Sequence, residues 1–429
     1  MIELFLALAA VLAFFMLLGV PIGYAMFITG FAGLFLTLGL EPTIGLLTSV
    51  AYSQTASYVF STIPMFILLA EFLNKSDLLD DTFEFMYRWT SWLPGGLAIS
   101  TTLANGGFAA LSGSSTAASA ALSKIAVPEM RKYEYEDKLS MGTVAASGTF
   151  AMMFPPSIAL IVYGILTETS ISALFIAGMI PGILTMLAYV LLIIIWVKWS
   201  PNLAGKPAPA FSWKERFESL RPVWPALLLI AIVLGSIYLG VVTPTESGAM
   251  GAFGALLIGK FIYGLNLPDM QSALSNTVQT TAMIFIIILG ALVLGRYLAI
   301  TGLTTALIQF VSGLPLGPHG ILIVLLIVYL ILGMVMNQTA ILVLTLPITF
   351  PLATQGLGFH PIWFGIVVIK TAEIGMVTPP FGLNVFVATS QVDVDVWEAF
   401  KGSSRFIIAD LVVLALLIMY PQIATWLIP

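Results

Sequence analysis

The chain of 429 residues contains no cysteine and only two histidines, His319 and His360. Without cysteine, disulfides, thiol chemistry and cysteine-ligated metal sites are excluded. The two histidines stand alone in predicted loops, where histidines are more often incidental than metal ligands, and no Ser-His-Asp arrangement is suggested. A glycine-rich phosphate loop is also missing. These absences argue against an intramembrane enzyme and against ATP hydrolysis as a source of energy.

Charged side chains are scarce, at 9% of the residues, whereas 59% of the residues are hydrophobic. Soluble domains carry roughly 25% charged residues, so too few polar side chains remain here to cover a water-exposed surface. Apolar runs of about 20 residues recur without strand alternation, which favours membrane-spanning helices over a β-barrel. The sequence therefore predicts an all-α polytopic membrane protein, with no nucleic-acid partner. We interpret the first run, Ile2–Val20, as a retained helix rather than a signal peptide.

Two apolar segments cannot be unbroken helices. Met141–Thr169 is interrupted by Pro155-Pro156, and Phe364–Gln391 is interrupted by Pro379-Pro380. Each proline removes a backbone donor and breaks the helical hydrogen-bond ladder. Backbone released from helix at membrane depth is tolerated only inside protein or along a cavity. Interruptions at matching places in two halves of a chain are the best sequence indication of a transporter's binding site.

Two further regions are predicted to be re-entrant hairpins, Leu93–Val127 and Ile321–Ala353. The first is dominated by Gly, Ala, Ser and Thr, and we expect an unwound tip within Gly106–Ser115. A small-residue helix that crosses the membrane and packs tightly against neighbours is the alternative. The second region carries the sequence GMVMNQT, residues 333–339, at its centre.

The distribution of positive charge supports the hairpins independently. If both regions are hairpins, fourteen of the sixteen Lys and Arg residues fall on one side of the membrane, which the positive-inside rule assigns to the cytoplasm. If either region crossed fully, every later loop would change sides and the sorting would be lost. Both termini are then predicted to lie outside. Each half has three spans, a hairpin, a broken span and a closing span, so the halves form an inverted repeat.

Smaller features carry their own expectations. The third span, about Ser49–Leu73, is expected to kink at Pro64, and the amphipathic segment Asn74–Trp92 is expected to lie at the membrane interface. Prolines should keep the connection Lys198–Arg221 out of helix. Lys370 and Glu373, three residues apart, either neutralise each other or act directly as ligands, and the first reading is favoured. Glu71 and Asp410 are expected near helix ends, at the interface.

Oxygen atoms are abundant at the hairpin tips and breaks. Ser112–Ser115 is expected to face Gly148–Ser157, and Gly333–Thr339 to face Thr371–Asn384. Unwound carbonyls and hydroxyls form hard, neutral cages that suit Na+, and the N-termini of half-helices suit an anionic substrate. A channel or a structural membrane subunit remains an alternative to a secondary transporter, but it leaves the paired breaks unexplained.

Several motifs together resemble the large membrane subunit of the tripartite ATP-independent periplasmic (TRAP) transporters. They are GVPIGYAM at 19–26, STIPMFILLAEFL at 61–73, GGFAALSGSSTA at 106–117, FPPSIALIVYG at 154–164, LTLPITFPLA at 344–353 and EIGMVTPPFGLNVFV at 373–387. The resemblance covers essentially the whole chain. It implies Na+-coupled uptake of an organic acid across the bacterial inner membrane. The acid would be delivered by a periplasmic substrate-binding protein, and a small four-helix membrane subunit would complete the permease.

The resemblance also implies an elevator-type ion transporter, in which hairpins and broken helices slide against a fixed scaffold. The expected division of the chain is 1–92 for the first scaffold helices and an interfacial arm helix, 93–197 for the first transport elements, 198–221 for a cytoplasmic connection, 222–316 for the second scaffold helices and 317–429 for the second transport elements. The identity of the acid stays open.

Site residues follow from the same resemblance. One Na+ site would use Ser112, Ser115, Ala151 and Phe154, partly through carbonyls, and the other would use Gly333, Gly375, Thr378 and Phe381. The candidates for the substrate are Ser157 and Asn384, just past the proline pairs, with Ser114 and Thr116 at the first tip. The sequence departs from the family pattern at Ala151, often a glycine, and at Asn337, commonly an acidic residue.

Overall fold

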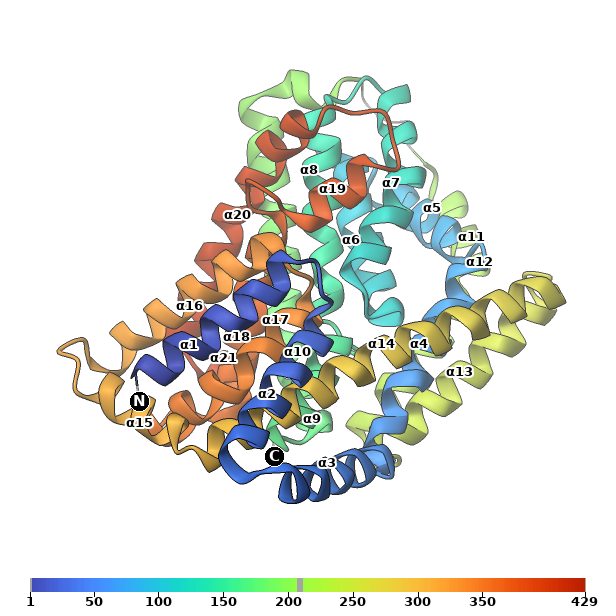
Figure 1. Cartoon of the computed structure of the whole chain (residues 1–429). Helices are drawn as coiled ribbons and strands as arrows, with labels where there is room; N and C mark the ends of the chain where they lie inside the picture. The colour runs from blue at the N-terminus through green and yellow to red at the C-terminus, as the bar shows by residue number, and fades with distance from the viewer. Residues whose placement is uncertain (1, 207–210, 429) are drawn as a thin grey trace.

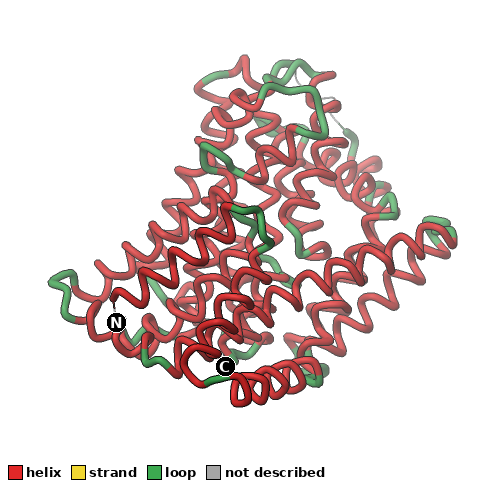
Figure 2. Tube along the Cα trace, in the orientation of Figure 1, coloured by secondary structure: helices red, strands yellow, loops and turns green. Residues whose placement is uncertain are grey.

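The computed structural model describes residues 2–206 and 211–428, and within these residues the chain consists of helices and connecting loops without strands (Figures 1 and 2). The helices are α1 (Ile2–Leu17), α2 (Ile22–Leu38), α3 (Leu40–Thr55), α4 (Thr62–Asn74), α5 (Leu78–Thr90), α6 (Gly96–Ser112), α7 (Ser115–Lys132), α8 (Asp137–Gly148), α9 (Ile158–Thr167), α10 (Ile171–Trp199), α11 (Trp213–Glu218), α12 (Leu220–Tyr238), α13 (Pro244–Phe261), α14 (Leu267–Ile300), α15 (Leu303–Ser312), α16 (Gly317–Val335), α17 (Gln338–Pro351), α18 (Pro361–Val377), α19 (Leu383–Thr389), α20 (Val396–Met419) and α21 (Gln422–Thr425). Short 3₁₀ turns are η1 (Tyr58–Ser61), η2 (Thr149–Met152) and η3 (Pro201–Ala204), and η4 (Leu352–Gly356) is a π turn.

Both predicted hairpins are present. Helices α6 and α7 pack against each other and are joined at Gly113 and Ser114, and α16 and α17 are joined at Met336 and Asn337. The unwound tip of the first hairpin is much shorter than expected, because helix α6 continues through Gly106 to Ser112. All of these residues except the half-buried Gly107 are buried inside protein, with the Cβ position of Gly106 only 2.8 Å from the sulfur of Met186. Their composition therefore reflects close packing, and only Gly113, with φ +60°, ends the helix.

Both proline pairs interrupt helices as predicted. Helix α8 ends at Gly148 and η2 follows; the cis Pro155-Pro156 bond then precedes α9. Helix α18 ends at Val377, and the cis Pro379-Pro380 bond precedes α19. Thr378 is extended (φ −92°, ψ 134°) because the residue before a proline is excluded from the helical region.

The contacts between helices repeat in the way that an inverted repeat requires. Helix α2 of the first half packs against α14 of the second, and α4 packs against α13, so the second and third spans exchange roles between halves. The return arm of each hairpin packs on the half-helix of the opposite repeat, α7 on α19 and α17 on α9. In Figure 1 the hairpin α6–α7 gathers with α8, α19 and α20, whereas α14 crosses beside α2 and α4.

Two local expectations are corrected. The third span breaks at residues 56–61, between α3 and α4, and not at Pro64. Pro64 lies in the first turn of α4, where a backbone N–H group would have no acceptor within the helix, so the proline costs no hydrogen bond. The connection 198–221 is also partly helical, because Ser212 and Glu215 form a capping box that starts α11.

The amphipathic segment forms α5, which buries Leu79 and Phe83 on its inner face. The helix packs against α6, α11 and α12. The indole of Trp89 donates a hydrogen bond to the carbonyl of Arg216 at 3.1 Å, and its ring meets Trp213 and Phe217 edge-on. One end of the connection between the halves is therefore held on α5.

Six helices of the described residues are long and apolar enough to cross a membrane: Ile171–Trp199, Leu220–Tyr238, Leu267–Ile300, Gly317–Val335, Gln338–Gly356 and Val396–Met419. Length and composition do not set the direction of crossing, which stays a prediction from the positive charges.

Reporter fusions test this predicted topology. Fusions after Arg131, Arg216 and Lys401 are expected to report the cytoplasm, and a fusion at Gly358 the outside, because Lys and Arg cluster on the inner side. A periplasmic signal at Arg131 combined with a cytoplasmic signal at Gly358 would mean that the orientation of the repeat is reversed.

Candidate functional site

The tip of the first hairpin lies against the first break. The Cβ position of Gly113 is 2.8 Å from the carbonyl oxygen of Pro156, and that of Gly148 is 3.1 Å from the carbonyl oxygen of Ser115. A side chain at Gly148 would also overlap the hydroxyl of Ser119. The sequence-predicted facing of Ser112–Ser115 and Gly148–Ser157 is therefore present in the structure.

The first set of predicted ion ligands is enclosed. Ser112, Ser115, Ala151 and Phe154 are all buried. The hydroxyl oxygen of Ser112 has no hydrogen-bond partner among the described residues, whereas the hydroxyl of Ser115 lies 3.8 Å from the sulfur of Met376 in α18. A buried hydroxyl without a partner is costly, so Ser112 is the side chain of this set that is free to bind an ion.

In the second half, the hairpin and the broken helix meet backbone to backbone. The Cβ position of Gly375 is 2.6 Å from the Cα atom of Gly333 and 2.7 Å from the carbonyl oxygen of Leu330. The Cβ position of Gly333 is 2.9 Å from the Cα atom of Gly375. Helices α16 and α18 can approach this closely only because both residues are glycines. The structure therefore brings these two predicted ligands together.

Thr378 and Phe381 lie in the loop after α18. The amide of Thr378 donates to the carbonyl of Gly375 at 3.0 Å, and its hydroxyl donates to the carbonyl of Ile374 at 2.5 Å. Its own carbonyl oxygen is 3.3 Å from the Cβ position of Gly382. Phe381 is 55% exposed, whereas the corresponding Phe154 is 6% exposed. The second break thus opens to the surface of this chain, and the first is closed.

The predicted substrate residues differ in how strongly they are engaged. Ser157 caps α9 by accepting from the amide of Leu160 at 3.3 Å, and its hydroxyl donates to the carbonyl of Met152 at 2.6 Å. Ser114 caps α7 by accepting from the amide of Ala117 at 3.4 Å, and it lies 3.4 Å from the hydroxyl of Thr116. Both serines are thus at N-termini of helices, where anions are favoured.

Asn384 joins the two halves. Its side-chain amide donates to the carbonyl of Ala145 in α8 over 3.5 Å, and its side-chain oxygen has no partner among the described residues. Gln338 makes a second such link, donating to the carbonyl of Gly113 at the other hairpin tip over 3.5 Å. Gln338 was not among the predicted site residues, although it lies beside the predicted tip residue Asn337.

A buried cluster of charges lies near the breaks. The ammonium nitrogen of Lys370 is 2.8 Å from a carboxylate oxygen of Glu373 and 2.8 Å from one of Asp410. The hydroxyl of Tyr189 donates to the other Asp410 oxygen at 2.7 Å. The predicted pairing of Lys370 with Glu373 is confirmed, and the interfacial placement of Asp410 is wrong, since Asp410 is fully buried within α20. The position of Asp410 within an apolar run of the sequence could have indicated that it is buried.

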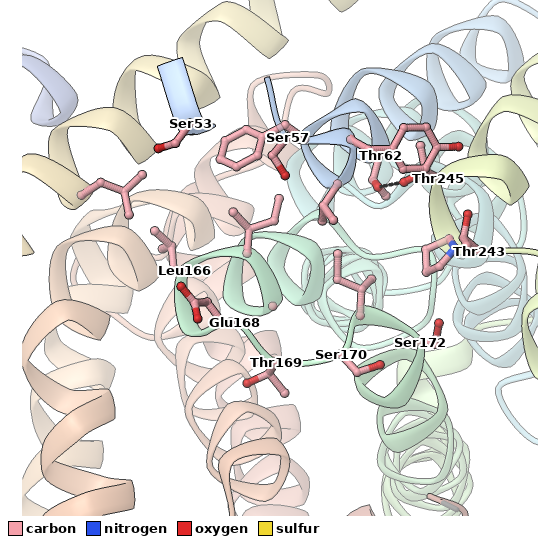
Figure 3. Close-up of a pocket in the computed structure, with 18 residues that line it drawn as sticks. Ser53, Ser57, Thr62, Leu166, Glu168, Thr169, Ser170, Ser172, Thr243 and Thr245 are labelled. Atoms are coloured by element: carbon pink, nitrogen blue, oxygen red, sulfur yellow. Dashed lines mark hydrogen bonds between the residues drawn. The ribbon is translucent and has the colours of Figure 1, made fainter. Parts of the chain in front are cut away.

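A cavity of about 540 Å³ lies apart from these residues (Figure 3). It is bounded by the α9–α10 turn, with Glu168 and Ser170, and by the facing segments that carry Ser57 and Thr243. At its edge the hydroxyls of Thr62 and Thr245 lie 2.5 Å apart. None of the predicted ion or substrate residues lines this cavity. It separates expected scaffold helices from expected transport elements.

The family model described as tripartite ATP-independent periplasmic transporter, DctM component, matches residues 9–423. The C4-dicarboxylate TRAP transporter large permease protein DctM of Pseudomonas aeruginosa is 34% identical and covers 87% of each chain. The sialic acid TRAP transporter large permease protein SiaM of Vibrio cholerae is 29% identical over 96% of this chain and 95% of its own. The solved YdaH transporter of Alcanivorax borkumensis has a TM-score of 0.64 at 13% identity over 91% of this chain and 90% of its own, which shows a shared fold. The chain therefore belongs to the DctM family, the large permease subunits of TRAP transporters, which are multi-pass membrane proteins of bacteria and not enzymes.

Proposed function

We propose that this chain carries an organic acid into the bacterial cell in symport with Na+. The observation that carries the proposal is that each inverted half packs a hairpin tip against a proline-broken helix, at Gly113 beside Pro156 and at Gly333 beside Gly375. Such meeting points supply carbonyl and hydroxyl oxygens at membrane depth, where they have no water to bind.

The oxygen atoms available where each hairpin meets a broken helix suit Na+. They are neutral oxygens, from the free Ser112 hydroxyl in the first half and from the backbone around Gly375 and Thr378 in the second. Ala151, Phe154 and Phe381 have no side-chain oxygen, so they would contribute carbonyls only. Ser115 and Gly333 would complete the two sets.

The carboxylate of the substrate would lie between the halves. Ser157, Asn384, Ser114 and Thr116 lie at or just inside the N-termini of α9, α19 and α7, where backbone donors and the helix dipole favour an anion. C4-dicarboxylate and sialic acid, which appear in the names of the two relatives, share a carboxylate. We therefore propose a carboxylate as the group that is recognised.

An elevator movement is the proposed mechanism. The segments 93–197 and 317–429 would slide against the scaffold segments 1–92 and 222–316, with 198–221 as the cytoplasmic connection. The cavity of about 540 Å³ beside the α9–α10 turn supports this, because the two sets of segments are not packed against each other there.

The proposed partners are a periplasmic substrate-binding protein and a small four-helix membrane subunit. We expect Na+-driven, saturable uptake in proteoliposomes only when both partners accompany this chain, because the binding protein delivers the acid and the second subunit completes the permease. The assay measures labelled carboxylate uptake with and without an inward Na+ gradient, omitting one component at a time.

Replacement of Na+ by choline is the control for the gradient. Robust Na+-driven uptake by the purified chain alone would contradict the dependence on partners. A passive, unsaturable flux would indicate a channel instead.

A further inference from the structure

We infer that the excess negative charge of the buried Lys370–Glu373–Asp410 cluster strengthens Na+ binding at the breaks. Glu373 acts through its charge and touches neither ion nor substrate. This inference rests on the proposed Na+ coupling. Among the described residues, these three are the only Asp, Glu, Lys or Arg side chains that are buried. Within the part of the chain that the structure describes, the electric field of buried charged side chains therefore comes from these three residues alone.

The charges of the cluster do not cancel. One ammonium is bonded to two carboxylates, so the formal charge is +1 − 2 = −1. Both oxygens of Asp410 are engaged, one by Lys370 and the other by Tyr189. Glu373 has one oxygen bonded to Lys370, and its other oxygen, Oε1, is buried without a partner. The unbalanced charge is therefore concentrated on Glu373.

A net charge buried in this way is costly unless something compensates for it. The helices that pack against α18 offer no compensation nearby. Of them, only α10 and α20 contain Lys or Arg, and these residues, Lys198, Lys401 and Arg405, are all exposed. The hydroxyl of Tyr189 is neutral and already donates to Asp410. A cation bound at the second break would offset this negative charge without contacting Glu373.

The cluster is close to the second proposed ion site, and Tyr189 links Asp410 to the first break. Glu373 precedes Gly375 by two residues and Thr378 by five on α18, and a helical rise of 1.5 Å per residue places it about 8 Å from the second break. The ring of Tyr189 lies 5.2 Å from that of Phe150 in η2, at the first break. At about 8 Å and an effective dielectric constant of about 20, one unit charge changes a binding constant by more than about tenfold.

The test is Glu373→Gln in the complete transporter reconstituted in proteoliposomes. The amide removes the charge but keeps an oxygen for Lys370, so the fold and the maximal uptake rate at saturating Na+ are expected to persist. The Na+ concentration for half-maximal uptake is expected to rise by about tenfold or more. Glu373→Asp, which restores the charge, should return it to within about threefold of the original chain. If Glu373→Gln does not fold, Asp410→Asn removes the same unit of charge and should shift the Na+ dependence in the same direction.

Glu398→Gln is the matched control. Glu398 pairs with Lys401, which is also three residues away, at the exposed start of α20. It should leave the Na+ dependence unchanged, since solvent screens that pair. An unchanged Na+ concentration for half-maximal uptake in Glu373→Gln would overturn the inference. An equal loss in Glu373→Gln and Glu373→Asp, together with a lowered melting temperature, would also overturn it by assigning Glu373 a structural role. Uptake by the unmodified transporter that ignores Na+ would instead contradict the proposed function.

Discussion

Gly375→Val is expected to abolish Na+-driven uptake while the protein still inserts into the membrane. A side chain at this position would meet the Cα atom of Gly333 at 2.6 Å and the carbonyl oxygen of Leu330 at 2.7 Å, and both of these are backbone atoms that cannot rotate away. Helices α16 and α18 must then separate, at a cost of about 1–3 kcal/mol or more. The oxygens around the proposed second ion site would separate with them. Uptake and its Na+ dependence, measured in proteoliposomes, report the effect.

Gly235→Val is the matched control, because Gly235 lies within helix α12 and its Cβ position has no atom within 4 Å. Both substitutions place the same β-branched residue in a helix, but only Gly375→Val brings it against the backbone of a neighbouring helix. Thr378→Val is expected to be milder, since the Thr378 hydroxyl bonds only to the carbonyl of Ile374, in the last turn of α18. Native Na+ affinity in Gly375→Val would remove this position from the proposed site.

Lys370→Met is expected to lower the stability of the chain by about 3–5 kcal/mol, because it leaves two buried carboxylates without their shared partner. Glu373 and Asp410 are each bonded to the Lys370 ammonium at 2.8 Å and are 1% and 0% exposed. These bonds hold α18 against α20, and Tyr189 extends the link to α10. Unfolding of the detergent-solubilised protein, followed by heat or denaturant, measures the loss.

Lys401→Met provides the comparison within the same chain. Lys401 pairs with Glu398 at 2.6 Å, also three residues away, but its side chain is 64% exposed. Solvent screens an exposed pair, so the substitution should change the stability little. Similar losses in the two variants would show that burial of the Lys370 cluster does not govern its contribution.

The elements that local chemistry dictates were predictable from the sequence. Proline pairs at 155–156 and 379–380 must break helices because they lack donors, and the structure has both breaks. The first hairpin followed from its small-residue composition and the second from the sequence GMVMNQT at its centre, and the sorting of Lys and Arg supported both. Errors arose where composition has two meanings, as at Gly106, whose small size serves close packing with Met186 and not unwinding.

Partnerships between distant segments depended on the tertiary structure. Hydropathy assigned Asp410 to a helix, but its contact with Lys370, forty residues away, exists only because α18 and α20 pack together. The contact of Gly333 with Gly375 and the link from Gln338 to Gly113 likewise require the hairpins to meet the opposite elements. Sequence by itself determined that helices break at the two proline pairs, because backbone donors and steric limits act within a few residues. Only the tertiary structure decided which oxygens and charges share the interior, because that depends on how separate helices pack.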